Sequence, residues 1–130
     1  MGGQFHTETA DVAGWARCWV WFLVALIMLL WVDLATTIAA AGFYGLESEA
    51  NPIMRTLLEN GLGVTLAIHA GIFLVALAGF SIVVRVGVGL EEPLQRRYRV
   101  FCLGWIGLLL IVGTGVAANN LALVFLAIGG

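Results

Sequence analysis

The chain has 130 residues and a formal net charge of −2; 62% of its residues are hydrophobic and only 11% are charged. A soluble domain carries about 25% charged residues, so this chain has too few polar side chains to cover itself in water. The acidic balance and the absence of a large basic patch also argue against a nucleic-acid partner. The composition therefore predicts an integral membrane protein whose partner is the lipid bilayer.

Three long apolar runs follow one another along the chain, over residues 14–44, 61–90 and 99–129. Each exceeds the ~20 residues that a helix needs to cross the hydrocarbon core of a bilayer. We expect three transmembrane helices in a single all-α domain covering residues 1–130. The first run is too long for a signal peptide and lacks a positively charged leader segment, so we expect it to be retained.

A short amphipathic helix is predicted in the first loop, over residues 52–60. Asn51 suits the N-cap of a helix and Pro52 its first position. Gly61 suits the residue that follows the last turn. Apolar side chains recur at helical spacing between these ends, at Ile53, Met54, Leu57 and Leu58. We expect this helix to lie in the membrane interface or over the bundle.

All six basic residues are arginines, and they are distributed unevenly. Five of them flank the N-terminus and the second loop: Arg17, Arg85, Arg96, Arg97 and Arg99. The first loop carries only Arg55. The positive-inside rule then predicts a cell-membrane protein with its N-terminus and second loop in the cytoplasm and its first loop and C-terminus outside. Residues 96–99 are expected to anchor the third helix to anionic lipid.

Asp33 lies within the first apolar run, where a charged side chain costs several kcal/mol and normally marks an ion path, a ligand site or a polar interior. Measured from the first-loop side, Asp33 in the first run, His69 in the second, and Asn119 and Asn120 in the third all lie roughly 12 to 14 Å below the same membrane face. We therefore predict one polar layer that joins the three helices.

Helical spacing adds hydroxyl groups to this layer. Thr36 and Thr37 follow Asp33 at i+3 and i+4, and Thr65 precedes His69 by four residues, so each set shares a helix face. Lipid cannot satisfy these groups, so the polar faces should turn toward one another.

Several functions remain open for the layer. Asp33, His69 and either Glu49 or Glu47 would give a carboxylate–imidazole–carboxylate set suited to a divalent metal, with Asn119 or a threonine completing the shell. An open coordination position would allow metal-assisted hydrolysis, with the remaining glutamate as base. Without a metal, Asp33 and His69 would form a titratable couple that passes protons or binds a cationic solute.

A non-catalytic alternative is an accessory or structural subunit whose buried polar pairs only hold the helices together. Its faces would dock to a homo-oligomer or to a larger membrane complex. No recognised nucleophile or phosphate-binding motif is present, so the sequence does not decide whether the protein is an enzyme.

Two short motifs carry a resemblance to a known family. Asp33-Leu-Ala-Thr36-Thr37 is followed, after a short stretch, by Glu49-Ala-Asn51-Pro52. This pattern resembles a family of small prokaryotic membrane proteins grouped as a domain of unknown function, DUF5658. The resemblance implies that Asp33, Thr37, Glu49, Asn51 and Pro52 are motif positions, which favours Glu49 over Glu47 as the partner acid. It implies no activity.

Overall fold

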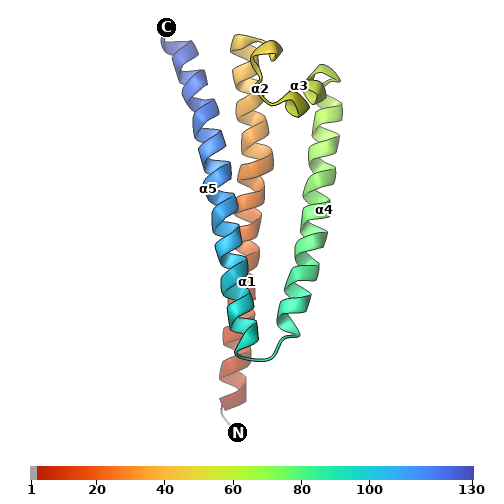
Figure 1. Ribbon diagram of the computed structural model, residues 1–130, viewed down its shortest axis with the longest axis vertical. Coiled ribbons are helices and arrows are strands. Elements are labelled where there is room, and N and C mark those ends of the chain that lie inside the picture. Colours follow the sequence, from red (N-terminus) through yellow and green to blue (C-terminus); the bar gives the residue numbers. More distant parts are fainter. Residues whose placement is uncertain (1–2) are drawn as a thin grey trace.

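The computed structural model describes residues 3–130, and their side chains from residue 12 onward. Helix α1 (Gly3–Ile27), the π-helical turn η1 (Met28–Val32) and helix α2 (Asp33–Tyr44) form one continuous rod (Figure 1). The first loop contains the 3₁₀ turn η2 (Leu46–Ser48) and helix α3 (Pro52–Glu59). Two long helices follow, α4 (Leu62–Val88) and α5 (Leu94–Gly129).

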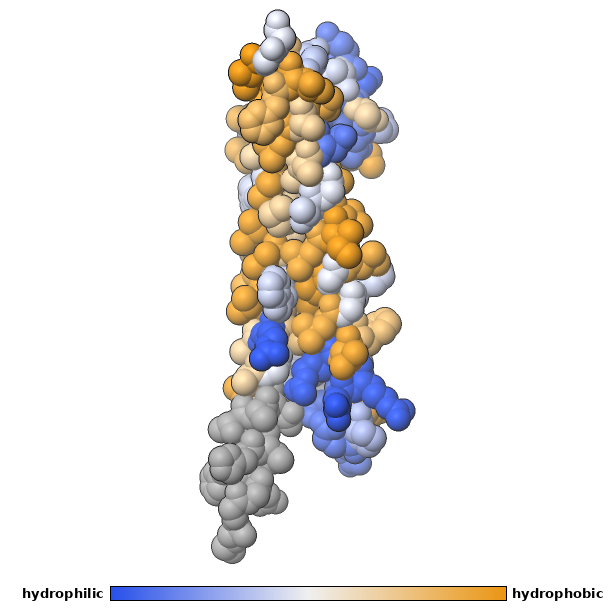
Figure 2. Space-filling view, turned by 90° about the vertical axis from the view of Figure 1, so that its left-hand side faces the viewer, coloured by the Kyte–Doolittle hydropathy of each residue, from blue (hydrophilic) through white to orange (hydrophobic). Residues whose placement is uncertain are grey.

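The described residues are helical without strands, and the prediction of three helices long and apolar enough to span a membrane is confirmed. Among the described residues, three helices are long and apolar enough to cross a bilayer, over Val12–Tyr44, Leu62–Val88 and Leu94–Gly129. Hydrophilic side chains gather toward the two ends of the described body, and a mainly hydrophobic band separates them (Figure 2). The first loop and the C-terminus lie at one end, and the N-terminus and the α4–α5 turn lie at the other (Figure 1).

The helix starts differ from the predicted ones at two places. Helix α1 begins at Gly3 rather than at residue 14, and α5 begins at Leu94 rather than at residue 99. In α5 the additional residues are mainly Leu, Gln and Arg, which are good helix formers. Their charged side chains do not interrupt the backbone hydrogen bonding of the helix.

The helix predicted in the first loop is present as α3, with its expected caps. The Asn51 side chain accepts hydrogen bonds from the backbone N–H groups of Ile53 at 3.0 Å and Met54 at 3.4 Å. Pro52 occupies the first turn, where its missing N–H has no cost. Gly61 has a φ of 104°, a conformation that glycine adopts readily. The location of α3 in the membrane interface stays a prediction.

The apolar core lies in the half of the molecule near the α4–α5 turn. Phe22 and Phe80 stack there with their ring centroids 4.0 Å apart, and Trp19 meets Phe80 edge-on at 4.9 Å. Toward the first loop the rod formed by α1, η1 and α2 stays beside α5, whereas α4 diverges from both (Figure 1). The polar residues of the predicted layer therefore lie in the half where the three helices pack least closely.

Close packing of α5 against η1 depends on Gly113. A Cβ atom at Gly113 would lie 3.2 Å from Cγ of Leu29 and 3.3 Å from its backbone nitrogen. The backbone atom cannot move aside without disturbing η1. A larger side chain here would push α5 away from the segment that leads into Asp33.

We expect Gly113→Leu to lower the free energy of unfolding by about 2 kcal/mol, because overpacking a tight helix contact typically costs that amount. Gly115→Leu is the matched control, since a Cβ there meets nothing within 4 Å. Thermal unfolding in the same detergent compares the two variants. Equal stability of the two variants would contradict the close packing at Gly113.

Candidate functional site

Asn120 of α5 joins the polar residues of α2. Its amide nitrogen donates to Oδ1 of Asp33 at 3.1 Å, to the hydroxyl of Thr37 at 3.1 Å and to that of Thr36 at 3.2 Å. Thr36 in turn donates to backbone carbonyls of its own helix, those of Val32 at 2.9 Å and Asp33 at 3.0 Å. The Asp-x-x-Thr-Thr motif thus forms one acceptor surface for a single asparagine amide.

The π-helical turn η1 sets the direction of Asp33. The backbone N–H of Asp33 bonds to the carbonyl of Met28, five residues earlier, instead of four as in an α-helix. The extra residue in this turn rotates the following helix face relative to the preceding one. Single π-helical turns are rare and occur frequently at functional sites. No feature of the apolar sequence over 28–32 predicts this turn.

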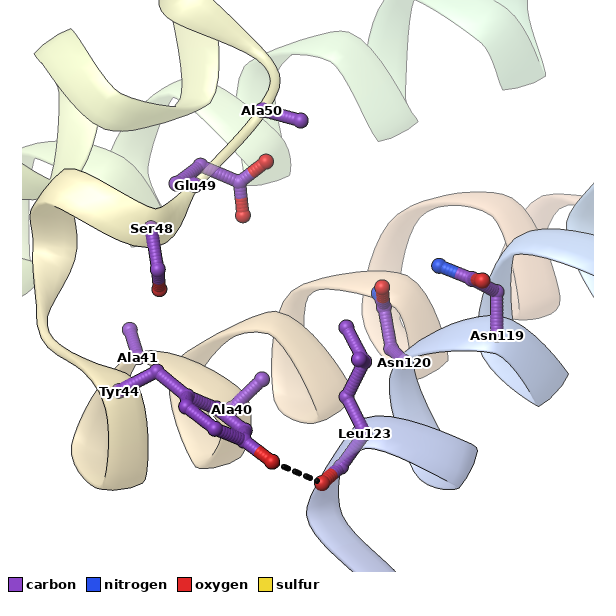
Figure 3. Close-up of a pocket in the computed structure, with 9 residues that line it drawn as sticks. All are labelled: Ala40, Ala41, Tyr44, Ser48, Glu49, Ala50, Asn119, Asn120 and Leu123. Carbon is purple, nitrogen blue, oxygen red and sulfur yellow. Dashed lines mark hydrogen bonds between the residues drawn. The ribbon is translucent and has the colours of Figure 1, made fainter. Parts of the chain in front are cut away.

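A pocket of about 280 Å³ opens at the first-loop end of the bundle, between α2, the first loop and α5 (Figure 3). Its polar lining comes from five residues, Tyr44, Ser48, Glu49, Asn119 and Asn120, and its apolar lining from Ala40, Ala41, Ala50 and Leu123. The Glu49 carboxylate and the side chains of Asn119 and Asn120 face the same space from opposite sides (Figure 3). The hydroxyl of Tyr44 donates to the backbone carbonyl of Leu123 at 3.0 Å and so ties α2 to α5 beside the pocket.

Glu49 is oriented by its own turn. One of its carboxylate oxygens, Oε1, accepts a hydrogen bond from the backbone N–H of Asn51 at 2.8 Å. Asn51 is itself fixed as the N-cap of α3. The Glu-x-Asn-Pro motif therefore both starts α3 and directs a carboxylate toward α5.

Arg55 holds the same loop from the other side. Its guanidinium donates to the backbone carbonyls of Glu47 at 2.8 Å and Glu49 at 2.5 Å. One nitrogen of the guanidinium, Nη2, is therefore held by main-chain oxygens, and Arg55 is not among the residues that line the pocket. The arginine shapes the loop and leaves the Glu49 carboxylate available to the pocket.

We expect Arg55→Met to loosen the segment over residues 46–51, because two backbone carbonyls lose a charged donor. Amide hydrogen exchange in that segment should speed up at least about tenfold, which corresponds to about 1.4 kcal/mol of local stability. Glu59→Gln, an exposed position on the same helix, is the control. Unchanged exchange in Arg55→Met would show that the loop is held by other contacts.

His69 is placed against the rod rather than in the pocket. It is 5% exposed, its Nδ1 lies 2.9 Å from the carbonyl of Thr65, and its ring lies 6.5 Å from that of Trp31. A neutral imidazole with its proton on Nδ1 donates to this carbonyl and keeps Nε2 as an acceptor. Both His69 and Glu49 lie within electrostatic range of Asp33.

Thr65 contacts backbone oxygens at the end of α3 and just before α4. Its hydroxyl lies 2.8 Å from the carbonyl of Leu57 and 3.1 Å from that of Gly61, and the residue is completely buried. It therefore joins the end of α3 to the start of α4. Its hydroxyl is occupied by backbone oxygens, and Thr65 is not among the residues that line the α2–α5 pocket.

The residues of the predicted layer thus lie in two places. Asp33 and Asn120 lie together beside the pocket, and His69 and Thr65 lie together on α4. Asn120 meets Asp33, whereas Asn119 is exposed at the pocket wall, and Glu47 points toward its own turn near Gly45. Within the described part of the chain, no three His, Cys, Asp or Glu side chains gather closely enough to hold a metal ion. The divalent-metal set stays a prediction.

Tyr44 and Ser48 are pocket residues that the sequence reasoning did not select. Tyr44 follows Thr37 by seven residues, two helical turns further along the same face of α2. That spacing was a usable signal for Tyr44. Ser48 carries no comparable signal, because its position depends on the fold of the loop, where its hydroxyl donates to the carbonyl of Gly45 at 2.7 Å.

Comparison with known proteins gives one match. A family model described as a domain of unknown function, DUF5658, matches residues 24–126. No curated protein matches the chain. No solved structure matches it either. The matched range includes the Asp33 segment, the first loop, α4 and the part of α5 that carries Asn120.

Proposed function

The chain belongs to the DUF5658 family, and from that premise we propose that it is a multi-pass membrane protein that binds a cation in the pocket between α2, the first loop and α5. The observation that carries this proposal is the orientation of the Asn120 amide. Its nitrogen is committed to Asp33 and the two threonines, so its oxygen is left on the side that faces Glu49 (Figure 3).

The lining supplies the oxygen atoms that hard cations prefer. The Glu49 carboxylate, the amide oxygen of Asn120 and the hydroxyl of Ser48 are ligands of the kind that bind sodium, magnesium or calcium ions. Imidazole and thiolate groups, which favour transition metals, are not among the lining residues. The composition of the pocket therefore supports a hard cation over the zinc-like site with His69, and over metal-assisted hydrolysis.

Electrostatics also favours a cation. Two acidic side chains belong to this region: Glu49 lines the pocket, and Asp33 is hydrogen-bonded to Asn120, another of its lining residues. The lining residues include no basic side chain. Like charges that share a site repel each other, and a bound cation relieves that repulsion. Neighbouring negative charges of this kind raise the affinity for a positive ligand.

The arginine distribution supports an orientation for this site. Five of the six arginines belong to the N-terminal segment and to the region of the α4–α5 turn, at the opposite end from the pocket. Under the positive-inside rule the pocket opens to the outside of the cell and the α4–α5 turn lies in the cytoplasm.

The test is a cation titration of the purified protein followed by thermal unfolding. Sodium, potassium, magnesium, calcium and manganese chlorides are compared at constant ionic strength, balanced with a bulky organic cation. We expect saturable stabilisation by at least one of them, since ligand at 100 times its Kd adds about 2.7 kcal/mol.

The matched variants are Glu49→Gln and Glu47→Gln, two acids of the same loop. Loss of the Glu49 charge should weaken the stabilising cation at least about tenfold, because a charge near a surface contributes about 1 to 4 kcal/mol at contact distance. Glu47→Gln should bind like the unmodified protein. An equal response of both variants, or no stabilising cation at all, would refute the proposed site.

The accessory-subunit alternative has one supporting observation. Helix α4 buries only four described residues along its length, namely Thr65, His69, Phe80 and Gly87. Helices this exposed often pack against another chain within the membrane. Light scattering of the protein extracted in mild detergent distinguishes a single copy from a homo-oligomer or a complex of fixed stoichiometry.

A further inference from the structure

We propose that an anionic phospholipid binds along α4 and α5, with an acyl chain in an apolar groove and its phosphate at Arg97. This lipid site lies toward the opposite end of the molecule from the cation pocket and does not depend on it. The groove and the basic turn are separate features of the surface, and Arg97 is the residue of the basic turn that lies on the same side of α5 as the groove residue Phe101.

The apolar groove has a volume of about 310 Å³ and lies between α4 and α5. Phe22 of α1, Gly79 and Phe80 of α4, and Phe101 and Trp105 of α5 are among its walls. A Cβ at Gly79 would meet nothing within 4 Å, so the groove is open above bare backbone at this point. Because these helices are the candidate membrane spans, the groove opens toward acyl chains.

The basic end of the site is the first turns of α5. A second pocket of about 440 Å³ is lined there by Pro93, Arg96, Arg97 and Val100. Arg97, Phe101 and Trp105 follow one another at intervals of four residues, so they form one stripe on the helix. Arg97 therefore lies about 6 Å along the helix axis from Phe101, which is a wall of the groove.

The apolar groove and the basic turn together indicate which kind of ligand would bind. A ligand that fills both parts must be apolar where it lies in the membrane and anionic at the interface, as an anionic phospholipid is. Arginine binds phosphate oxygens through two parallel N–H groups, and basic residues at a membrane surface attract anionic lipids. Glu91 and Glu92 precede this turn but do not line its pocket. A free phosphate would use the arginines and leave the groove unfilled.

The probe is a brominated lipid, which quenches tryptophan fluorescence on contact. The protein is reconstituted into phosphatidylcholine vesicles that contain an equal mole fraction of brominated phosphatidylglycerol or brominated phosphatidylcholine. Subtracting the signal of Trp105→Phe isolates the quenching of Trp105. We expect the association constant of the phosphatidylglycerol to exceed that of the phosphatidylcholine about fivefold or more.

Two variants separate the parts of the site. Arg97→Gln should remove the preference, so that the two lipids associate equally, while both lipids still quench. Gly79→Leu should fill the groove and weaken quenching by both lipids. Gly71→Leu, on the same helix with open space around its Cβ and outside the groove, should change neither.

Three outcomes would overturn the proposal. They are equal association of the two lipids with the unmodified protein, an undiminished preference in Arg97→Gln, and unchanged quenching in Gly79→Leu. Added inorganic phosphate should not compete with phosphatidylglycerol at constant ionic strength, because it has no acyl chain for the groove. Full competition by inorganic phosphate would assign the arginines to a free anion and would likewise contradict a lipid site.

Discussion

Asn120→Leu should lower the free energy of unfolding by about 1 to 2 kcal/mol. The substitution keeps the size of the side chain and removes the one amide that donates to Asp33, Thr36 and Thr37. A polar group left without its partner in a buried setting costs more than the hydrogen bond itself was worth. Interhelical hydrogen bonds in membranes have contributions of this size. Unfolding in mixed micelles of increasing denaturing detergent measures the change.

A double-mutant comparison isolates the pair. In Asp33→Leu/Asn120→Leu both polar groups are replaced together, and replacing both partners is close to neutral, so most of the lost stability should return. Asn119→Leu is the control, because Asn119 is exposed and its loss should change stability by less than about 0.5 kcal/mol. If Asn119→Leu and Asn120→Leu were equally destabilising, the contact between Asn120 and Asp33 would not contribute measurably to the free energy of unfolding.

Asp33→Asn should leave stability almost unchanged and weaken cation binding at least about tenfold. The new amide oxygen still accepts the hydrogen bond from Asn120, so α2 and α5 stay together. The negative charge below the pocket is lost, however, and with it part of the attraction for a cation. The titration used for Glu49→Gln measures the affinity, and thermal unfolding without cation measures the stability.

The two measurements on Asp33→Asn separate binding from packing. A variant that loses stability but binds the cation normally would show that Asp33 only holds the helices together. That result would support the structural alternative that the sequence leaves open. The reverse pattern, normal stability with weak binding, is the expected one.

The pairing of Asp33 with Asn120 was within reach of the sequence. The sequence predicts both residues at one depth below the first-loop end of their helices, and this depth follows from the helix rise alone. Depth does not tell which way a side chain faces around the helix axis, so Asn119 and Asn120 could not be distinguished from the sequence. They are about 100° apart on the helix, and only Asn120 turns toward α2.

His69 shows the limit of that reasoning. Equal depth brings residues together only if the helices run side by side, and α4 diverges from the other two toward the first loop (Figure 1). His69 packs against Trp31 of the rod, and its Nδ1 lies at hydrogen-bond distance from a carbonyl of its own helix, but it does not line the pocket. The course of α4 relative to the other helices is a matter of tertiary packing, which sequence periodicity does not contain.

Local chemistry predicted α3 well because capping acts over a few residues. Asn51, Pro52 and Gly61 have preferences that arise within their own turn. The contacts of Arg55 with the carbonyls of Glu47 and Glu49 depend on how the loop folds back. The π-helical turn before Asp33 likewise has no local signature, since all five of its residues are apolar.

The most direct measurement is the amount of cation bound to the protein itself. Equilibrium dialysis against the stabilising cation, followed by elemental analysis, gives the number of ions for each chain. We predict close to one ion in the unmodified protein and in Glu47→Gln, and close to none in Glu49→Gln at the same free concentration. Equal amounts in Glu49→Gln and Glu47→Gln would contradict a cation site built on Glu49 and Asn120.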